Sequence, residues 1–214
     1  MKALPSRKDR ESEKNEISKI LNRIGAFNFG VFRLTSGKMS PYYIDLRIVP
    51  SFPDAFREVC SFYADFIKDN VGTKSFERVA GIPVAGIPFA ALIAYDLKKP
   101  FLYIRKGVRR HGRERRIEGV IAPGDRILIV DDLITTGLSL QNAAKTIVAE
   151  GGVVTDAVVL LDRQEGGKER LAKRGIEVHA MLNITEIASR LHELGTIDQD
   201  QLRTILKQIR TSKK

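Results

Sequence analysis

Two adjacent carboxylates stand at the end of an apolar run in the stretch ILIVDDLITTGLSL, residues 127–140. Asp131 and Asp132 are followed by hydroxyl side chains and a glycine, and then by a helix-forming pattern. In open parallel sheets, ligands gather beyond the carboxyl ends of strands, and a glycine turn that enters a helix offers free N–H groups to a phosphate. Carboxylates accept hydrogen bonds from vicinal hydroxyls. The stretch therefore predicts a ribose phosphate site, with the acids under the sugar and the turn around its phosphate.

A plainer interpretation of the same stretch is a turn at the end of a strand, with the two aspartates capping the following helix. The chain has no G-x-x-x-x-G-K-[ST] and no G-x-G-x-x-G motif, which disfavours a P-loop or a dinucleotide-binding fold. The stretch by itself leaves both interpretations of the aspartates open.

Positive charge is concentrated in one short segment. The chain has a formal charge of +10, from 36 basic and 26 acidic residues, and RKGVRRHGRERR at 105–116 holds seven Arg or Lys against one Glu. This concentration predicts a polyanionic partner, either a nucleic acid or a phosphorylated small molecule. A solvated basic loop without a ligand is the alternative. The segment contains no interleaved aromatic residue, which argues against a surface for single-stranded nucleic acid.

Length and composition set the class of protein. With 214 residues, 43% of them hydrophobic and 29% charged, the chain fits one soluble globular domain. Its opening segment, MKALPSRKDRESEKNE, is charged throughout, and no apolar run approaches the ~18 residues of a membrane helix. We therefore expect a cytoplasmic protein without a signal peptide or membrane contact. Cys60, the only cysteine, is predicted to be a small core residue.

The order of the apolar patterns predicts the fold class. Continuous apolar runs of strand length alternate with segments of helical periodicity, as in α/β domains built around a mainly parallel sheet. The order of the strands in the sheet cannot be read from these patterns. Strands are predicted at 29–34, 41–49, within 77–86, and at 100–105, 126–130, 153–162 and 176–184; helices are predicted before Gly25, after Pro53, and at 87–97, 139–152, 184–195 and 198–209.

Five motifs together carry a family resemblance. VDDLITTG at 130–137 resembles the phosphoribosyl-pyrophosphate signature of type I phosphoribosyltransferases. FGVFRLTSGKMSPYYIDLR, GIPVAGIPFA, RKGVRRHGRERRIEG and LLDRQEGG accompany it, and the five occur in the expected order between about residues 29 and 167. As a set they resemble orotate phosphoribosyltransferases.

The resemblance implies a fold, which is α/β and type I phosphoribosyltransferase-like. A mainly parallel central sheet flanked by helices would carry a small hood over the base site and a flexible basic loop. One domain over 1–214 is implied, with an N-terminal helix and hood elements at about 8–50, a core at about 51–185 and C-terminal helices at about 184–210. A homodimer is also implied, with the basic loop reaching the partner's site.

The resemblance also implies a reaction. Orotate would displace pyrophosphate from C1 of phosphoribosyl pyrophosphate through a ribosyl cation-like transition state, giving orotidine 5′-monophosphate in pyrimidine biosynthesis. Mg²⁺ is implied as the cofactor, held mainly by the pyrophosphate and without a direct protein ligand.

Site residues follow from the resemblance position by position. Catalytic roles are implied for Arg109, His111, Asp131 and Asp132. His179 and His192 lie in apolar-periodic segments and are predicted to be structural. Binding of phosphoribosyl pyrophosphate is implied for the four catalytic residues and for Arg105, Lys106, Leu133, Ile134, Thr135, Thr136, Gly137, Leu138 and Ser139.

Orotate binding is implied for Arg163, Thr135, Tyr43 and Ile44. Orotate carries a carboxylate that uracil lacks, and a planar guanidinium matches a carboxylate in a bidentate pair. We therefore expect Arg163 to decide the choice of base. The alternative for Arg163 is a surface side chain paired with Glu165.

Three positions depart from the family pattern. Arg109, Ala85 and Thr35 stand where relatives often carry lysine. Arginine keeps the positive charge of lysine but cannot give up a proton. The handling of pyrophosphate in this chain is therefore open at these positions.

Two other functions remain as alternatives. One is a phosphoribosyltransferase for another base, which Arg163 disfavours because a neutral base offers it no carboxylate. The other is a nucleotide-sensing regulator that keeps the fold and binds nucleic acid. The charge of +10 and the basic end KQIRTSKK favour it slightly, but the first 25 residues are too short for a separate helix-turn-helix domain.

Overall fold

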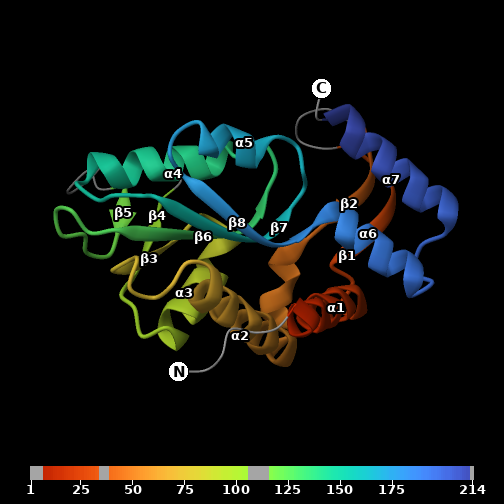
Figure 1. Cartoon of the computed structure of the whole chain (residues 1–214), viewed down its shortest axis with the longest axis horizontal. Coiled ribbons are helices and arrows are strands. Elements are labelled where there is room, and N and C mark those ends of the chain that lie inside the picture. Colours follow the sequence, from red (N-terminus) through yellow and green to blue (C-terminus); the bar gives the residue numbers. More distant parts are fainter. Residues whose placement is uncertain (1–6, 34–38, 106–115, 213–214) are drawn as a thin grey trace.

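A central sheet dominates the molecule (Figure 1). The computed structural model describes residues 7–33, 39–105 and 116–212, and within them six strands lie in the order β5-β4-β3-β6-β7-β8. Neighbouring strands are parallel, except that β5 is antiparallel to β4. The predicted α/β fold with a mainly parallel sheet is confirmed. The strands are β3 (Arg78–Gly81), β4 (Phe101–Ile104), β5 (Ile117–Glu118), β6 (Ile127–Ile134), β7 (Asp156–Asp162) and β8 (Glu177–Asn183).

The apolar runs of β6 and β7 occupy the middle of this sheet because helices cover both faces. Ile129 and Val130 on β6 and Val159 and Leu160 on β7 are all 0% exposed. A continuous apolar run suits a strand between two helical layers, whereas an alternating pattern would leave polar side chains in one of the cores.

Helices α4 (Leu138–Ala149) and α5 (Gly167–Ala172) lie on one face of the sheet, and α2 (Pro53–Asn70) and α3 (Gly86–Asp96) lie on the other (Figure 1). Adjacent strand residues enter two different cores. Val158 belongs to the core that contains α2 and α3, and Val159 to the core that contains α4. Cys60 of α2 is fully buried, which confirms its predicted place in the core.

A smaller layer stands to one side of the central sheet (Figure 1). The strands β1 (Phe27–Arg33) and β2 (Met39–Ile44) form an antiparallel pair, and residues 34–38 between them lie outside the described residues. Around this pair lie α1 (Arg7–Arg23), α6 (Ile184–Glu193) and α7 (Gln199–Ser212).

Polar contacts tie the N-terminal and C-terminal helices of this layer together. Lys14 of α1 pairs with Glu186 of α6 at 2.5 Å. The Ser40 hydroxyl on β2 lies 3.4 Å from Gln208 Oε1 on α7. Elements from both ends of the sequence therefore support one hairpin. No helix of the described part of the chain is long and apolar enough to span a membrane.

The strand predicted at 41–49 is wrong in its second half. β2 ends at Ile44, and a 3-10 helix, η1, occupies Leu46–Ser51. The Asp45 side chain accepts a hydrogen bond from the backbone N–H of Arg47 at 3.1 Å, and this local cap competes with strand pairing. Pro50 within η1 has no N–H to offer a neighbouring strand.

β6 is longer than predicted, because it continues through Asp131 and Asp132 to Ile134. On one side β7 pairs with β6 as far as Ile134, whereas on the other side β3 pairs only as far as Val130. The aspartates therefore lie inside the strand, at the level where one neighbouring strand has already ended.

Two short elements, β5 and α5, were not predicted, since two and six residues are too few for a periodic pattern. The strand predicted from 153 begins at Asp156. Val153, before it, makes only an isolated bridge with Arg126.

The substitution Leu160→Ala should test the packing of the central strand. Leu160 is 0% exposed, so we expect a loss of about 2–5 kcal/mol in the free energy of unfolding. Urea unfolding followed by circular dichroism would measure it. Leu194→Ala, at a position 46% exposed, is the control, and an equal loss in both variants would contradict the assignment of Leu160 to the core.

Candidate active site

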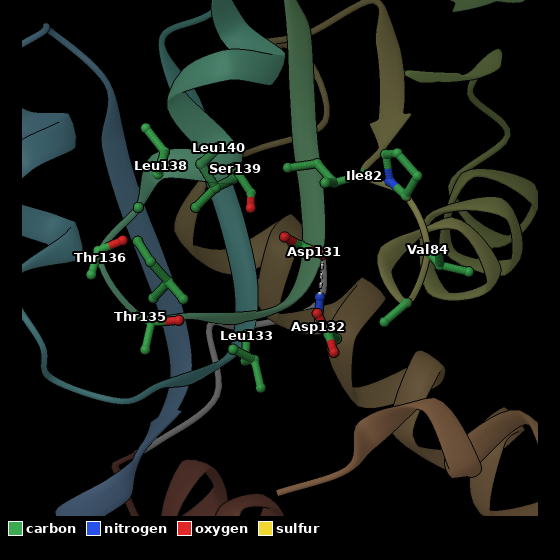
Figure 2. Close-up of a pocket in the computed structure, with 14 residues that line it drawn as sticks. Ile82, Val84, Asp131, Asp132, Leu133, Thr135, Thr136, Leu138, Ser139 and Leu140 are labelled. Atoms are coloured by element: carbon green, nitrogen blue, oxygen red, sulfur yellow. Dashed lines mark hydrogen bonds between the residues drawn. The ribbon is translucent and has the colours of Figure 1, made fainter. Parts of the chain in front are cut away.

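A cavity of about 190 Å³ lies at the carboxyl end of β6 (Figure 2). Two segments line it: the loop from β3 into α3, and the stretch from the end of β6 into α4. Both follow neighbouring parallel strands, so they reach the same edge of the sheet. All the residues from 131 to 139 that were predicted to bind phosphoribosyl pyrophosphate share this cavity. The lining consists of Ile82, Pro83, Val84, Ala85, Asp131, Asp132, Leu133, Ile134, Thr135, Thr136, Gly137, Leu138, Ser139 and Leu140.

Two helix N-termini meet this cavity. Helix α4 begins after Gly137 and α3 begins after Ala85, and neither cap residue supplies a side-chain hydrogen bond to the first turn. The first N–H groups of a helix have no acceptor within the helix and carry the positive end of its dipole. An anion in the cavity would therefore be met by backbone donors from two sides.

The turn before α4 keeps its shape through close backbone packing. Gly137 has a φ of +75°, and a Cβ at this position would lie 2.6 Å from Leu171 Cδ2 and 3.0 Å from the Gly167 carbonyl oxygen. A Cβ on Gly167 would in turn lie 2.5 Å from the Thr135 carbonyl oxygen. The turn and the start of α5 thus pack backbone against backbone, and this packing fixes the shape of the turn.

Side chains of this stretch divide between the core and the cavity. Ile134 and Leu140 are each 1% exposed and belong to the core, so Ile134 can meet a ligand only through its backbone. Thr136 and Ser139 are exposed. Figure 2 shows the Ser139 hydroxyl and the Asp131 carboxylate directed toward the same space.

Asp131 is 6% exposed and is held from several sides. The Tyr63 hydroxyl donates to its carbonyl oxygen at 2.9 Å, and the backbone N–H of Asp132 donates to its Oδ1 at 3.0 Å. A Cβ on Gly86 would lie 2.6 Å from the same Oδ1, so only glycine fits at the start of α3. Asp131 and Asp132 point to different sides of β6 (Figure 2), as adjacent residues of a strand do.

The two carboxyl groups affect each other's ionisation. Burial raises the pKa of Asp131 well above its ordinary value, and the neighbouring Asp132 carboxylate raises it further. Burial also raises the pKa of Asp132, although hydrogen bonds from Asp131 and from the backbone lower it in part. Both acids therefore resist ionising together. Hydroxyl donors or a cation entering the cavity would favour their charged forms.

Arg163 lies just beyond β7 and is 7% exposed, so the alternative of a surface side chain is wrong. It does pair with Glu165, with 3.1 Å between Arg163 Nε and Glu165 Oε1. The pair lacks hydrogen-bond alignment, and among the described residues neither of these two buried atoms has a hydrogen-bond partner. A buried guanidinium whose Nε–H has no hydrogen-bond acceptor is a favourable place for an anion.

The phosphoribosyl transferase domain family matches residues 54–189 of the chain. An orotate phosphoribosyltransferase of Cenarchaeum symbiosum is 41% identical over 188 residues, which cover 88% of this chain and 94% of that protein. The chain belongs to the orotate phosphoribosyltransferase family.

Other members of this family agree in sequence and in fold. An orotate phosphoribosyltransferase of Staphylothermus marinus is 41% identical over 88% of this chain and 91% of that protein. The crystal structure of the orotate phosphoribosyltransferase from Aeropyrum pernix matches with a TM-score of 0.70 at 29% identity, over 84% of this chain and 99% of that one. The family and the type of fold predicted from the sequence motifs are confirmed.

The basic loop begins and ends beside the cavity. The Arg105 backbone N–H donates to the Arg116 carbonyl at 2.8 Å, and the Arg105 guanidinium pairs with Glu118 at 2.5 Å. Arg105 and Arg116 also line an open groove of about 700 Å³, which shares one wall with the cavity. Lys106, Arg109 and His111 lie outside the described residues, as does Thr35, so their roles stay predictions.

The predicted orotate residues on β2 face different ways. Ile44 is 6% exposed and packs in the core. Tyr43 is half-buried, its ring centroid lies 5.7 Å from that of Phe32, and its hydroxyl accepts a hydrogen bond from Arg47 Nη2 at 2.6 Å. Of these two residues, Tyr43 is therefore the one whose side chain a base could reach.

Three potential metal ligands lie elsewhere. Asp156, Glu177 and His179 have donor atoms within 4.8 Å of one another, but they stand at the starts of β7 and β8, at the end of the sheet opposite the cavity. His179 Nε2 lies 2.8 Å from Asp156 Oδ1, and His192 Nδ1 lies 3.1 Å from the Ile197 carbonyl oxygen. These contacts fit the structural roles predicted for both histidines.

Several supporting residues escaped the sequence analysis. Tyr63 and Gly86 fix Asp131 from behind, and Tyr42 lies against Arg163. Strand alternation puts Tyr42 on the same face of β2 as Ile44, but the sequence does not say what that face meets. Tyr63 is one apolar position on a helical stripe, and nothing marks its hydroxyl as special.

We expect Asp131→Asn to be more stable than the unmodified chain at neutral pH while losing activity. A carboxyl group whose pKa rises on folding favours the folded state when it is protonated. That contribution is lost as the pH rises from the pKa of an aspartate in the unfolded chain, about 4, toward the raised pKa of Asp131 in the folded protein. Urea unfolding across this range should show the two proteins converging in acid and separating as the pH rises.

Asp125→Asn is the opposite control, because a hydrogen bond from Arg78 lowers the pKa of Asp125. Its charge stabilises the fold above the unfolded pKa, so this variant should be the less stable protein at neutral pH. An Asp131→Asn variant that followed the same trend would contradict the raised pKa of Asp131.

Gly137→Ala should weaken binding of phosphoribosyl pyrophosphate and lower stability. The new Cβ adds about 1–2 kcal/mol of backbone strain and contacts Gly167 and Leu171. Gly195→Ala is the matched control, since Gly195 has a φ of +70° with nothing within 4 Å of a Cβ. Calorimetric titration with the donor should separate the two variants; equal affinities would argue against a phosphate cradle at Gly137.

Proposed function

We propose that this chain transfers the phosphoribosyl group of phosphoribosyl pyrophosphate to orotate, giving orotidine 5′-monophosphate and pyrophosphate in pyrimidine biosynthesis. The observation that carries the proposal is the cavity at the end of β6, where two helix N-termini and the carboxyl groups of Asp131 and Asp132 meet. Family membership fixes the type of reaction, and the buried Arg163 supports the choice of base.

The donor would lie along the cavity with its ends in different electrostatic surroundings. The turn from Thr135 to Ser139 offers N–H groups and hydroxyls for the 5′-phosphate. Asp131 and Asp132 would accept hydrogen bonds from the ribose hydroxyls, and the N-terminus of α3 would face the pyrophosphate. As the bond from C1 to the pyrophosphate oxygen breaks, a ring nitrogen of orotate bonds to C1, and its proton passes to the leaving pyrophosphate.

The protein's contribution would be positioning and charge stabilisation rather than covalent chemistry. Positive charge grows on the ribose in the transition state, and the nearby carboxylates would stabilise it. Negative charge grows on the leaving pyrophosphate, where Arg105 and the predicted loop residues Lys106, Arg109 and His111 would neutralise it. The chain is proposed to form a homodimer in which this loop reaches the active site of the partner subunit. The enzyme is also proposed to work in the cytoplasm.

Mg²⁺ is proposed as the cofactor, held mainly by the pyrophosphate. The residues present fit such an ion, because carboxylate and hydroxyl oxygens at the cavity are ligand types that it prefers, directly or through water. Bound Mg²⁺ would supply further neutralisation of the leaving group. The raised pKa values of Asp131 and Asp132 would fall beside this added positive charge.

Incubation with orotate, phosphoribosyl pyrophosphate and Mg²⁺ tests the proposal, with loss of orotate absorbance as the readout. We expect turnover of orotate, none of uracil or purine bases, and little without Mg²⁺. Turnover of another base would favour the first alternative. Binding of nucleic acid at physiological salt without any turnover would favour the regulator.

Arg163→Ala should separate base recognition from donor binding. Loss of a bidentate pair with the orotate carboxylate should lower kcat/KM for orotate by about a hundredfold or more. The affinity for phosphoribosyl pyrophosphate should stay nearly unchanged. Arg203→Ala, at an exposed position on α7, controls for the loss of charge, and failure of donor binding in Arg163→Ala would refute the assigned role.

A further inference from the structure

Arg163 is held in place by a residue that the sequence motifs did not single out. The guanidinium carbon lies 5.1 Å from the centroid of the Tyr42 ring, and Nη2 lies 3.5 Å from the Tyr42 hydroxyl. The backbone N–H of Arg163 donates to the Ile134 carbonyl at 2.9 Å. The guanidinium therefore lies over the Tyr42 ring, while the backbone fixes the base of the Arg163 side chain.

The carboxylate of Glu165 offsets the positive charge of Arg163 but accepts no hydrogen bond from its Nε. The 3.1 Å contact with Arg163 Nε lacks hydrogen-bond alignment, so the pair attracts mainly as two charges. A cation over an aromatic ring is attracted by the ring face, most strongly where water is excluded. The guanidinium is therefore held by the ring of Tyr42 as well as by the charge of Glu165.

Tyr42 is itself immobilised. It is 2% exposed, and its carbonyl oxygen accepts a hydrogen bond from the Ser40 hydroxyl at 2.7 Å. The same hydroxyl lies 3.4 Å from Gln208 Oε1 on α7. A connected path therefore runs from the C-terminal helix through Ser40 and Tyr42 to Arg163.

The neighbouring tyrosine has different surroundings. The Tyr43 hydroxyl is engaged by Arg47, and its ring lies beside Phe32 on the other side of β2. The two tyrosines thus point to opposite faces of β2. Of the two, Tyr42 contacts Arg163, the residue proposed to bind the carboxylate of the base.

We propose that Tyr42 is a positioning residue for orotate: its ring sets the plane of the Arg163 guanidinium and so fixes where the carboxylate of a planar, carboxylated base is bound. This inference rests on the proposed function. Tyr42 acts only through Arg163 and touches neither the donor nor the reacting atoms. Discrimination between carboxylated and uncharged bases is therefore the property that it controls.

Steady-state kinetics of Tyr42→Leu and Tyr42→Phe should test the role of the ring. Loss of the ring in Tyr42→Leu should raise KM for orotate about tenfold or more, because small misplacements of a binding group have large effects. KM for phosphoribosyl pyrophosphate should stay nearly constant, so the ratio of the KM for orotate to the KM for the donor should rise by a similar factor. Tyr42→Phe keeps the ring and should change KM for orotate by less than about threefold. Tyr95→Leu, at a position 80% exposed on α3, is the control.

A double-mutant cycle separates this role from a general structural one. In the Arg163→Ala background, Tyr42→Leu should cause no further rise in KM for orotate. Equal increases in KM for both substrates, or additive effects with Arg163→Ala, would overturn the inference. If Tyr42→Leu does not fold, the same cycle with Tyr42→Met decides the question. Absence of orotate turnover in the unmodified chain would refute the proposed function instead, so the two failures are distinguishable.

Discussion

Burial of the Asp131 carboxyl group beside the start of α3 constrains everything around the cavity. An ionisable group in such a place needs neighbours that hold it, and it has the Tyr63 hydroxyl behind its carbonyl oxygen and the next backbone N–H on Oδ1. The space exists because β3 stops at the level of Val130 while β6 continues along β7. The register of the sheet, the position of α3 and the ionisation of Asp131 therefore depend on one another.

The cavity is electrically polarised along its length. Helix N-termini contribute positive potential where α3 and α4 begin, and the two aspartates contribute negative charge in their ionised forms. A molecule with phosphates at its ends and hydroxyls in its middle suits this distribution better than a uniformly charged one. Arg105 and Arg116 add positive charge from the neighbouring groove.

The sequence predicted the parts of this arrangement that are local. The apolar run before Asp131, the glycine at 137 and the helix after it are contiguous, so one stretch of chain carried most of the information about the cavity. The continuous apolar runs likewise predicted a sheet that is covered by helices on both faces. The extent of β6 was beyond prediction, because it depends on where β3 and β7 stop beside it.

Long-range contacts account for what was missed in the site. Tyr42 and Arg163 are 121 positions apart, and strand alternation could say only that Tyr42 and Ile44 share a face. The sequence named the pairing of Arg163 with Glu165, but the burial of Arg163, the burial of Ile44 and the support from Tyr63 arise from packing between elements distant in sequence. The short helix after Ile44 was a different failure, in which a side-chain cap at Asp45 prevailed over strand propensity.

Gly86 limits how charge can be added to the wall formed by α3. Its backbone lies so close to Asp131 that no side chain can begin there, and the next positions are an isoleucine and a proline that has no N–H. Ala85, directly before the helix, lines the cavity and is a position on this wall that can carry a side chain. A lysine introduced at that position would lower the raised pKa values of Asp131 and Asp132 and would also attract the pyrophosphate. A substitution at position 85 would therefore change two properties at once: the binding of the leaving pyrophosphate and the ionisation of the aspartates beside the ribose.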